Sequence, residues 1–116
     1  MSYEIRLVYD DKFVEVPPHN YGGTVVFNGT QKAELNITSN YSPFFREHLG
    51  KDGIFWLSGK KAEDTTERLE HVVSALSNFT PSEDYWKPTA GNVGKTLSIL
   101  LEWARHCPYA SWEVLN

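Results

Sequence analysis

The hydrophobic pattern of this chain changes its period near residue 40, and that change constrains the fold more than any other feature. In residues 3–9 every odd-numbered position is apolar or aromatic, which is the alternation of a half-buried strand. After residue 42 the apolar residues recur at the three- and four-residue spacing of amphipathic helices. Strands followed by helices, without regular alternation of the two, are typical of an α+β domain.

Turn signals divide the strand-forming part of the chain. The pair Asp10-Asp11 predicts a turn, after which residues 12–16 return as a short second strand that Pro17-Pro18 ends, because proline cannot donate to a sheet. Asn28-Gly29 is a strong hairpin signal, since both turn positions favour positive φ. We therefore expect an antiparallel hairpin from Thr24 to Thr38.

The second part of the chain predicts three helices. Ser42, as N-cap, and the proline after it predict a short helix that ends at Leu49, followed by a loop over residues 51–59 that carries the apolar patch Ile54–Leu57. Longer helices are expected over residues 62–77 and 92–106. Their expected core residues are Leu69, Val72, Val73 and Leu76 in the first, and Leu97, Leu100, Leu101 and Ala104 in the second.

These elements predict one α+β domain spanning residues 1–116. The expected architecture is an antiparallel sheet of three to five strands, with two main helices packed on one face and a short third helix. Residues 111–114 are expected to add a short terminal strand.

Composition and charge narrow the classes of function. The formal net charge of −4 argues against non-specific nucleic-acid binding, which needs a basic face. No apolar run is long enough to span a membrane, and the first residues lack the pattern of a secretory signal. The single cysteine, Cys107, suits a reducing compartment, so we expect a cytoplasmic protein. The four histidines lack metal-ligand spacing, and we expect neither a metal site nor a cofactor.

A row of small polar residues is the first candidate for a binding site. Asn36, Thr38 and Asn40 would share one face of an extended strand, where their amides and hydroxyl could hydrogen-bond a base, a sugar or an amide. The alternative is an ordinary solvent-exposed sheet face, with Asn40 belonging to the turn before the next helix.

A loop cluster of aromatic, basic and hydroxyl residues is the second candidate. Within residues 85–89, Trp86 could stack on a flat ring and Lys87 could meet a phosphate. The alternative reading is that Trp86 plugs the core from a loop.

The stretch from Thr89 to Thr96 imitates the end of a phosphate-binding P-loop. Thr89 stands where the first glycine should be, and no buried strand precedes the stretch, so we reject a nucleotide-hydrolysing P-loop. The stretch is better interpreted as a helix start capped by Thr89 or Asn92, where Lys95 adds positive charge for an anion.

Three stretches, 22–24, 33–41 and 84–92, resemble a family of small uncharacterised proteins encoded by phages, prophages and bacterial and archaeal genomes. The resemblance covers nearly the whole chain and centres on the patterns Asn-Ile-Thr-x-Asn-Tyr and Tyr-Trp-Lys-Pro-Thr-x-Gly-Asn. This chain departs from the family at Ser39, where an aromatic residue is frequent, and at Asn28, where glycine is frequent. Because the family patterns fall on the two polar clusters, the resemblance implies that both clusters form one site. The expected ligand-binding residues are Asn36, Thr38, Asn40, Tyr41, Trp86, Lys87, Thr89, Asn92 and Lys95.

These observations favour a non-enzymatic protein that binds a small polar ligand. By association, the phage setting suggests a counter-defence protein that sequesters a nucleotide-type immune signal. The alternative is an acidic inhibitor, similar to anti-CRISPR proteins, that binds a host defence protein through the apolar patch Ile54–Leu57. An enzyme acting on a nucleotide is a third hypothesis, for which the sequence offers no recognisable acid, base or nucleophile set. The many aromatic residues also favour a homo-oligomer.

Overall fold

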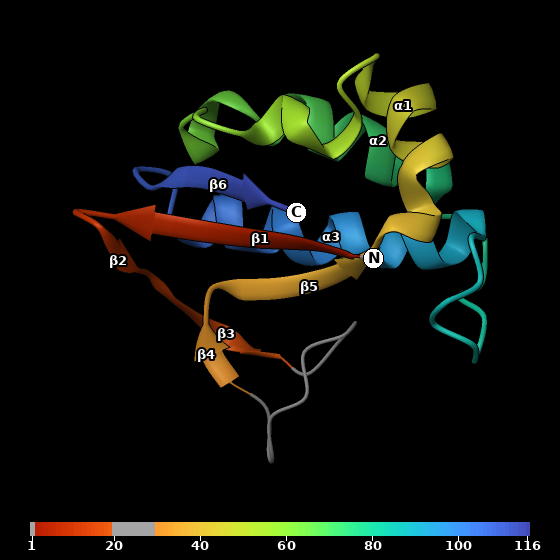
Figure 1. Ribbon diagram of the computed structural model, residues 1–116, viewed down its shortest axis with the longest axis horizontal. Helices are drawn as coiled ribbons and strands as arrows, with labels where there is room; N and C mark the ends of the chain where they lie inside the picture. Colours follow the sequence, from red (N-terminus) through yellow and green to blue (C-terminus); the bar gives the residue numbers. More distant parts are fainter. Residues whose placement is uncertain (1, 20–29) are drawn as a thin grey trace.

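Strand β1 (Ser2–Tyr9) is the centre of the main antiparallel sheet in the computed structural model, which describes residues 2–19 and 30–116. One side of β1 pairs with β6 (Ser111–Leu115), and the other pairs with β5 (Glu34–Thr38) and β2 (Lys12–Phe13). The first and last strands of the chain are therefore neighbours (Figure 1).

The turn between β1 and β2 confirms the expected tight connection. Asp10 and Asp11 have φ values of 54° and 61°, the left-handed conformation that a two-residue hairpin turn requires at both positions. Aspartate tolerates this conformation because its short side chain can hydrogen-bond locally.

The predicted end of the second strand at Pro17-Pro18 is wrong. A separate strand, β3 (Glu15–His19), runs through both prolines and pairs with β4 (Thr30–Lys32) in a small second sheet. The register shifts between the paired positions Glu15 and His19, so the prolines lie in an irregular stretch where a missing ladder donor is tolerated.

The predicted hairpin from Thr24 to Thr38 is only partly within the described residues. The turn at Asn28-Gly29 and the strand before it lie outside them. The expected strand 32–38 is divided at Ala33 into β4 and β5, and β5 pairs along its described length with β1. The backbone of Ala33 instead bonds to Val14 and Leu7, which links the two sheets.

Helix α1 (Ser42–Leu49) begins earlier than the Ser-Pro signal predicts. Ser42 is the first helical residue and not the N-cap, because a 3₁₀ turn, η1 (Ser39–Tyr41), leads directly into the helix. The Ser42 hydroxyl does not cap the helix but donates to the carbonyl oxygen of Ser39 at 2.7 Å.

The two longer helices pack against each other on one side of the sheet. Helix α2 (Thr66–Leu76) follows a short 3₁₀ turn, η3 (Ala62–Asp64), so the predicted helix 62–77 has an irregular first turn. Helix α3 (Ala90–His106) lies behind the main sheet in Figure 1. These helices and the antiparallel sheet confirm the α+β architecture.

The core lies between the sheet and α3. The buried sheet residues are Ile5, Leu7, Leu35, Ile37, Trp112 and Val114, and they join Leu97, Leu100, Leu101 and Ala104 of α3 in one cluster. Each fully buried aliphatic side chain of this kind contributes about 1.5–3 kcal/mol. In α2, Leu69, Val72 and Leu76 are buried as expected, whereas Val73 is only partly covered.

The expected apolar patch Ile54–Leu57 is only partly at the surface. These residues belong to a 3₁₀ helix, η2 (Gly53–Leu57), which buries Ile54 and Leu57 completely in the core. Trp56 is partly covered, with the cationic groups of Lys60 and Arg68 over its ring. Only Phe55 stays exposed among these four residues.

Candidate functional site

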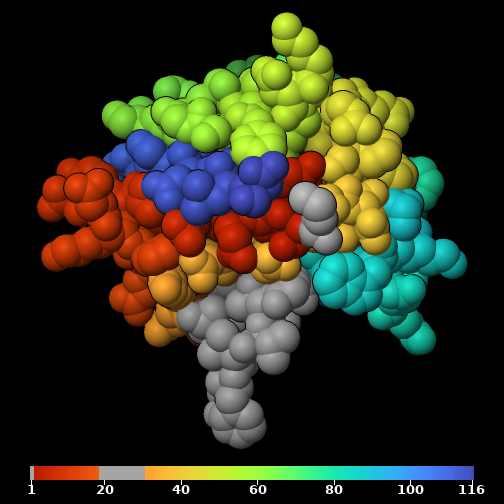
Figure 2. Space-filling view, viewed as in Figure 1, coloured from red at the N-terminus to blue at the C-terminus, as the bar shows by residue number. Residues whose placement is uncertain are grey.

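The loop between α2 and α3 docks against the end of β5, which brings the two predicted polar clusters together. This loop, residues 77–89, stands beside η1 and the first turn of α3 in Figure 1. The space-filling view shows the loop and the segment around residue 40 as one continuous surface (Figure 2). The following contacts hold the loop in this place.

Tyr85 attaches the loop to the outer edge of β5. Its hydroxyl oxygen accepts from the backbone N–H of Thr38 at 2.9 Å and donates to the carbonyl oxygen of Asn36 at 3.2 Å. Its ring packs edge-on against Tyr41 with the centroids 5.6 Å apart, and the Tyr41 hydroxyl donates to the Tyr85 carbonyl oxygen. A single side chain thereby bonds two backbone groups along β5, the N–H of Thr38 and the carbonyl oxygen of Asn36.

Asn92 organises the loop from the opposite side. Its carboxamide is fully buried in the first turn of α3. The amide nitrogen donates to the carbonyl oxygens of Lys87 at 2.8 Å and Asp84 at 3.0 Å, and the amide oxygen accepts from the N–H of Ser82 at 2.8 Å. Asparagine suits this position because one side chain supplies both donors and an acceptor.

Two hydroxyls cap the turns on either side of the contact. Thr89 is the N-cap of α3, and its hydroxyl accepts from the N–H of Asn92 at 3.1 Å, as one of the two cap alternatives predicted. Thr38 caps η1 in the same way by accepting from the N–H of Asn40 at 3.2 Å. Asn40 therefore belongs to the turn before α1, which is the alternative reading of the polar row.

Asn40 and Trp86 meet at the surface. The side-chain nitrogen of Asn40 donates to the carbonyl oxygen of Trp86 at 3.0 Å. The indole is 54% exposed, and its centroid lies 5.2 Å from that of the Tyr85 ring, at 71°. Trp86 therefore does not plug the core but forms part of the surface, supported from below by Tyr85.

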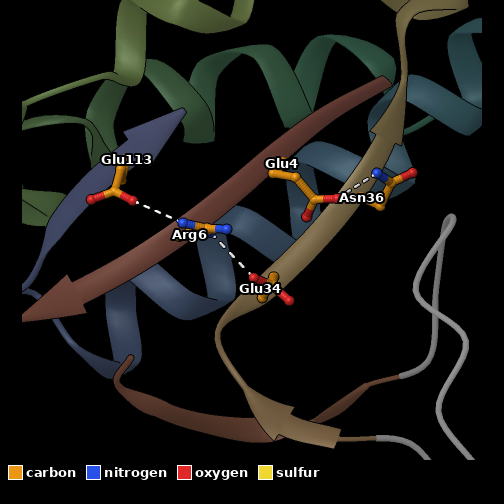
Figure 3. A network of polar contacts seen from close by, with 5 residues as sticks. All are labelled: Glu4, Arg6, Glu34, Asn36 and Glu113. Atoms are coloured by element: carbon orange, nitrogen blue, oxygen red, sulfur yellow. Dashed lines mark hydrogen bonds and ion pairs between the residues drawn. The ribbon is translucent and has the colours of Figure 1, made fainter. Parts of the chain in front are cut away.

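Asn36 belongs to a polar network on the face of the sheet that the helices do not cover (Figure 3). Its side-chain nitrogen donates to a carboxylate oxygen of Glu4 at 2.7 Å. On the same face Arg6 lies 3.2 Å from Glu34 and 3.2 Å from Glu113, bridging β5 and β6 across β1. The Asn36 side chain is thus engaged with its own sheet, and its contribution at the loop is the backbone carbonyl.

The two predicted cationic residues lie in different places. Lys87 is exposed beside Trp86, and within the described part of the chain no carboxylate is within ion-pair distance of it. Lys95 lines a separate hollow with residues of α2 and Phe79. The loop contact therefore unites the other predicted residues and leaves Lys95 on a different surface.

The P-loop-like stretch is helical, and its glycines have a packing role. Thr89 to Thr96 runs from the N-cap into the body of α3. A Cβ atom at Gly91 would lie 2.2 Å from the carbonyl oxygen of Thr80, and one at Gly94 would lie 2.9 Å from Cβ of Leu76. Both positions need glycine because the loop and α2 approach the helix closely.

Tyr85 belongs to the predicted loop cluster, but its pattern in the sequence did not indicate a role. The structure makes it the main attachment of the loop, through its hydroxyl and its ring. The residue type itself indicated that Tyr85 would make a hydrogen bond, because a tyrosine that becomes covered needs a partner for its hydroxyl. The partner could not be named, since it is the backbone of a strand almost fifty residues earlier.

The described residues offer neither a metal site nor a membrane-spanning helix. Across residues 2–19 and 30–116, no cluster of three His, Cys, Asp or Glu side chains has an arrangement that could hold a metal ion. In the same part of the chain, no helix has the length and apolarity to cross a membrane. Comparisons with protein-family models, with curated proteins and with solved structures find no match.

Proposed function

We propose that this protein binds, without turnover, a small molecule that has a flat ring and a negative charge, of the nucleotide type. The binding surface consists of Asn40, Trp86 and Lys87, called here the Trp86 surface. The observation that supports it best is the 54% exposure of an indole that a fixed loop presents beside a lysine.

The loop holds the indole in position before any ligand arrives. Tyr85 supports one edge of the ring, and Asn40 fixes the backbone of Trp86 at 3.0 Å. The N–H of Trp86 also donates to the Asp84 carboxylate at 3.1 Å. A preorganised aromatic ring binds more tightly because less conformational entropy is lost on binding. Stacking of a base on such a ring contributes about 1–3 kcal/mol.

The neighbouring lysine supports an anionic ligand. Lys87 is exposed and follows Trp86 directly, so a ligand stacked on the indole could place a phosphate near its ammonium group. The other residues of the predicted site that lie at the loop act indirectly in this proposal. Asn36, Thr38, Tyr41, Thr89 and Asn92 make the internal contacts that hold the loop and are positioning residues.

The biological role follows from the resemblance to phage-encoded proteins. In that setting, a binding protein without turnover would sequester a nucleotide-type immune signal in the host cytoplasm, which makes it a counter-defence protein. Self-association is part of the proposal, since exposed aromatic side chains outside the Trp86 surface, such as Tyr9 and Tyr109, could pack against a second copy.

The test is a thermal-shift screen with cyclic and linear nucleotides, followed by titration of tryptophan fluorescence. We expect at least one nucleotide to raise the melting temperature and to be recovered unchanged by mass spectrometry. Trp86→Ala should weaken its binding at least tenfold, whereas Trp86→Tyr, which keeps a stacking ring, should lose less. Phe79→Ala is the matched control, because it removes an exposed aromatic ring outside the Trp86 surface.

Three outcomes separate the alternatives. No response to any nucleotide would overturn the proposal, and so would a response that Trp86→Ala leaves intact. Chemical conversion of the bound nucleotide would identify an enzyme instead. Native mass spectrometry of the purified protein reports the number of subunits and any co-purified ligand.

An acidic inhibitor of a host protein remains a second candidate, supported by a different observation. Glu63, Glu67 and Glu70 line one open hollow on the exposed face of η3 and α2. Glu63 and Glu70 each lie beside a basic side chain, Lys61 at 3.9 Å and Arg105 at 3.1 Å, so they are partly neutralised. This face could compete with nucleic acid for a basic channel. Two of the four residues of the apolar patch first expected to carry this function, Ile54 and Leu57, are buried, so this candidate rests mainly on the acidic residues. Glu67→Lys combined with Glu70→Lys should abolish capture of a basic host protein, while Trp86→Ala should leave it unchanged.

A further inference from the structure

A hollow between α2 and α3 lies apart from the Trp86 surface and has the chemistry of a second binding site. Its volume is about 300 Å³, and it is lined by the later part of α2, the first residues of the loop and the first half of α3. The lining residues used below are Val73, Leu76, Phe79, Gly94 and Lys95.

The shape of this hollow follows from the close packing described above. At Gly91 the Thr80 carbonyl lies where a Cβ would be, which fixes the start of the loop over α3. The loop then presents Phe79 at the edge of the hollow with 56% of its surface exposed. At Gly94 the missing side chain lets Leu76 of α2 approach α3 closely, so this contact closes the floor of the hollow. Val73 is only partly covered by the core.

The lining combines apolar walls with a single type of charge. Val73, Leu76 and Phe79 provide apolar surface, and Lys95 is the one charged residue among those that line the hollow. Sites for small organic molecules are mostly apolar, carry a few polar groups and start at roughly 300 Å³.

We propose that this hollow binds a small amphiphilic anion, such as a medium-chain carboxylate or alkyl sulfate. The alkyl chain would lie in the open groove above the contact of α2 with α3 and cover Phe79 and Val73, while the anionic head would pair with the ammonium group of Lys95. Burial of the exposed Phe79 ring supplies the hydrophobic part of the binding free energy, and Lys95 makes the site prefer a negatively charged ligand.

This proposal does not depend on the proposed nucleotide site. Asn92 directs its side chain into the loop at residues 82–87, whereas Lys95, three residues later, lines the hollow against α2. A variant of one surface should therefore leave the other intact, and each proposal can fail separately.

The test is calorimetric titration of the full chain with four ten-carbon probes at concentrations below micelle formation. Decanoate and decyl sulfate should bind with one site per chain. Decanol and decyltrimethylammonium, which lack the negative charge, should bind at least tenfold more weakly. Equal binding of all four probes, or no binding of the two anions, would overturn the proposal.

Variants locate the binding within the molecule. Lys95→Met keeps the aliphatic stem and should weaken decanoate binding about tenfold, while Lys95→Arg should restore most of it. Ser98→Phe, which fills a position lining the hollow, should abolish binding. Trp86→Ala and Lys87→Met are controls that should not alter decanoate affinity. Unchanged binding in Lys95→Met and Ser98→Phe would contradict the assignment.

A competing occupant is a second copy of this chain. Sedimentation analysis of the wild type and of Phe79→Ala distinguishes it, because a dimer that Phe79→Ala dissociates would place protein in the hollow. That result would overturn the small-molecule proposal, whereas the same subunit number in both proteins, together with the expected decanoate selectivity, supports it.

Discussion

The side-chain nitrogen of Asn40 and the backbone carbonyl oxygen of Trp86 lie 3.0 Å apart, although 46 positions separate the two residues. This contact joins the turn after β5 to the loop before α3. The same loop is held by Tyr85 on the strand side and by Asn92 on the helix side. The position of the exposed indole therefore depends on several internal hydrogen bonds, each of which can be removed separately.

Removing the Asn92 side chain should release the loop. Asn92→Ala leaves the carbonyl oxygens of Lys87 and Asp84 and the N–H of Ser82 without this partner. We expect the free energy of unfolding to fall by roughly 2–4 kcal/mol, since each unsatisfied buried polar group costs about 1–3 kcal/mol and the loop can partly rehydrate. Urea denaturation measures the loss. Lys87→Ala, which keeps the backbone carbonyl, is the control and should change stability by less than about 0.5 kcal/mol.

Removing one oxygen atom from Tyr85 should weaken the attachment to β5. Tyr85→Phe keeps the ring against Tyr41 but loses the hydrogen bonds to Thr38 and Asn36. We expect a loss of about 1–2 kcal/mol in urea denaturation. Tyr9→Phe removes the same atom at an exposed position and should be nearly neutral. Equal effects of the two substitutions would show that the loop is not attached through this hydroxyl.

Alanine at the two glycines of α3 should destabilise the protein in a defined order. Alanine normally favours a helix over glycine by about 1 kcal/mol. At Gly91, however, the new Cβ would lie 2.2 Å from a backbone carbonyl oxygen, and at Gly94 it would lie 2.9 Å from a side-chain carbon. We expect Gly91→Ala to cost more than about 2 kcal/mol and Gly94→Ala to cost less. Thermal unfolding of both variants tests the order, and a stabilised Gly91→Ala would contradict the close approach of Thr80.

A buried hydrogen bond between Thr65 and Trp112 should stabilise the packing of η3 on β6. The indole N–H donates to the Thr65 hydroxyl oxygen at 2.9 Å, and that hydroxyl donates to the carbonyl oxygen of Ala62. Thr65→Val preserves the shape but leaves the indole N–H unpaired, which should cost about 1–3 kcal/mol. Thr65→Ser keeps the hydroxyl and should retain most of the stability. Chemical denaturation of the two variants provides the comparison.

The helices and the central strands were predictable because their apolar residues follow a regular period. The stripe Leu97, Leu100, Leu101 and Ala104 is buried as expected, as are Leu35 and Ile37 on the inner face of β5. Periodicity specifies which face of an element is covered, since that face must leave water whatever covers it. It also predicted the terminal strand, which forms as β6.

The wrong predictions of the sequence analysis share one physical cause: contacts with neighbouring segments override the local sequence pattern. Pro17-Pro18 does not end β3 because the register shift removes the need for a ladder donor there. Ser42 does not cap α1 because the preceding turn is already helical. Ile54 and Leu57 are buried because η2 folds back against β6 and α1, which no local pattern of this loop revealed.

By itself, the sequence determined the α+β class, the faces of the main helices and strands, and the two polar clusters. The tertiary structure alone decided what those clusters do: it turned most of their amides and hydroxyls inward to hold a loop, left Trp86 and Lys87 exposed, and moved Lys95 to a separate hollow. The reason is that periodicity acts along one segment, whereas a hydrogen-bond partner or a close approach is set by segments far apart in the chain. The sequence alone does not show whether a polar side chain forms its hydrogen bonds with another part of the protein or with a ligand.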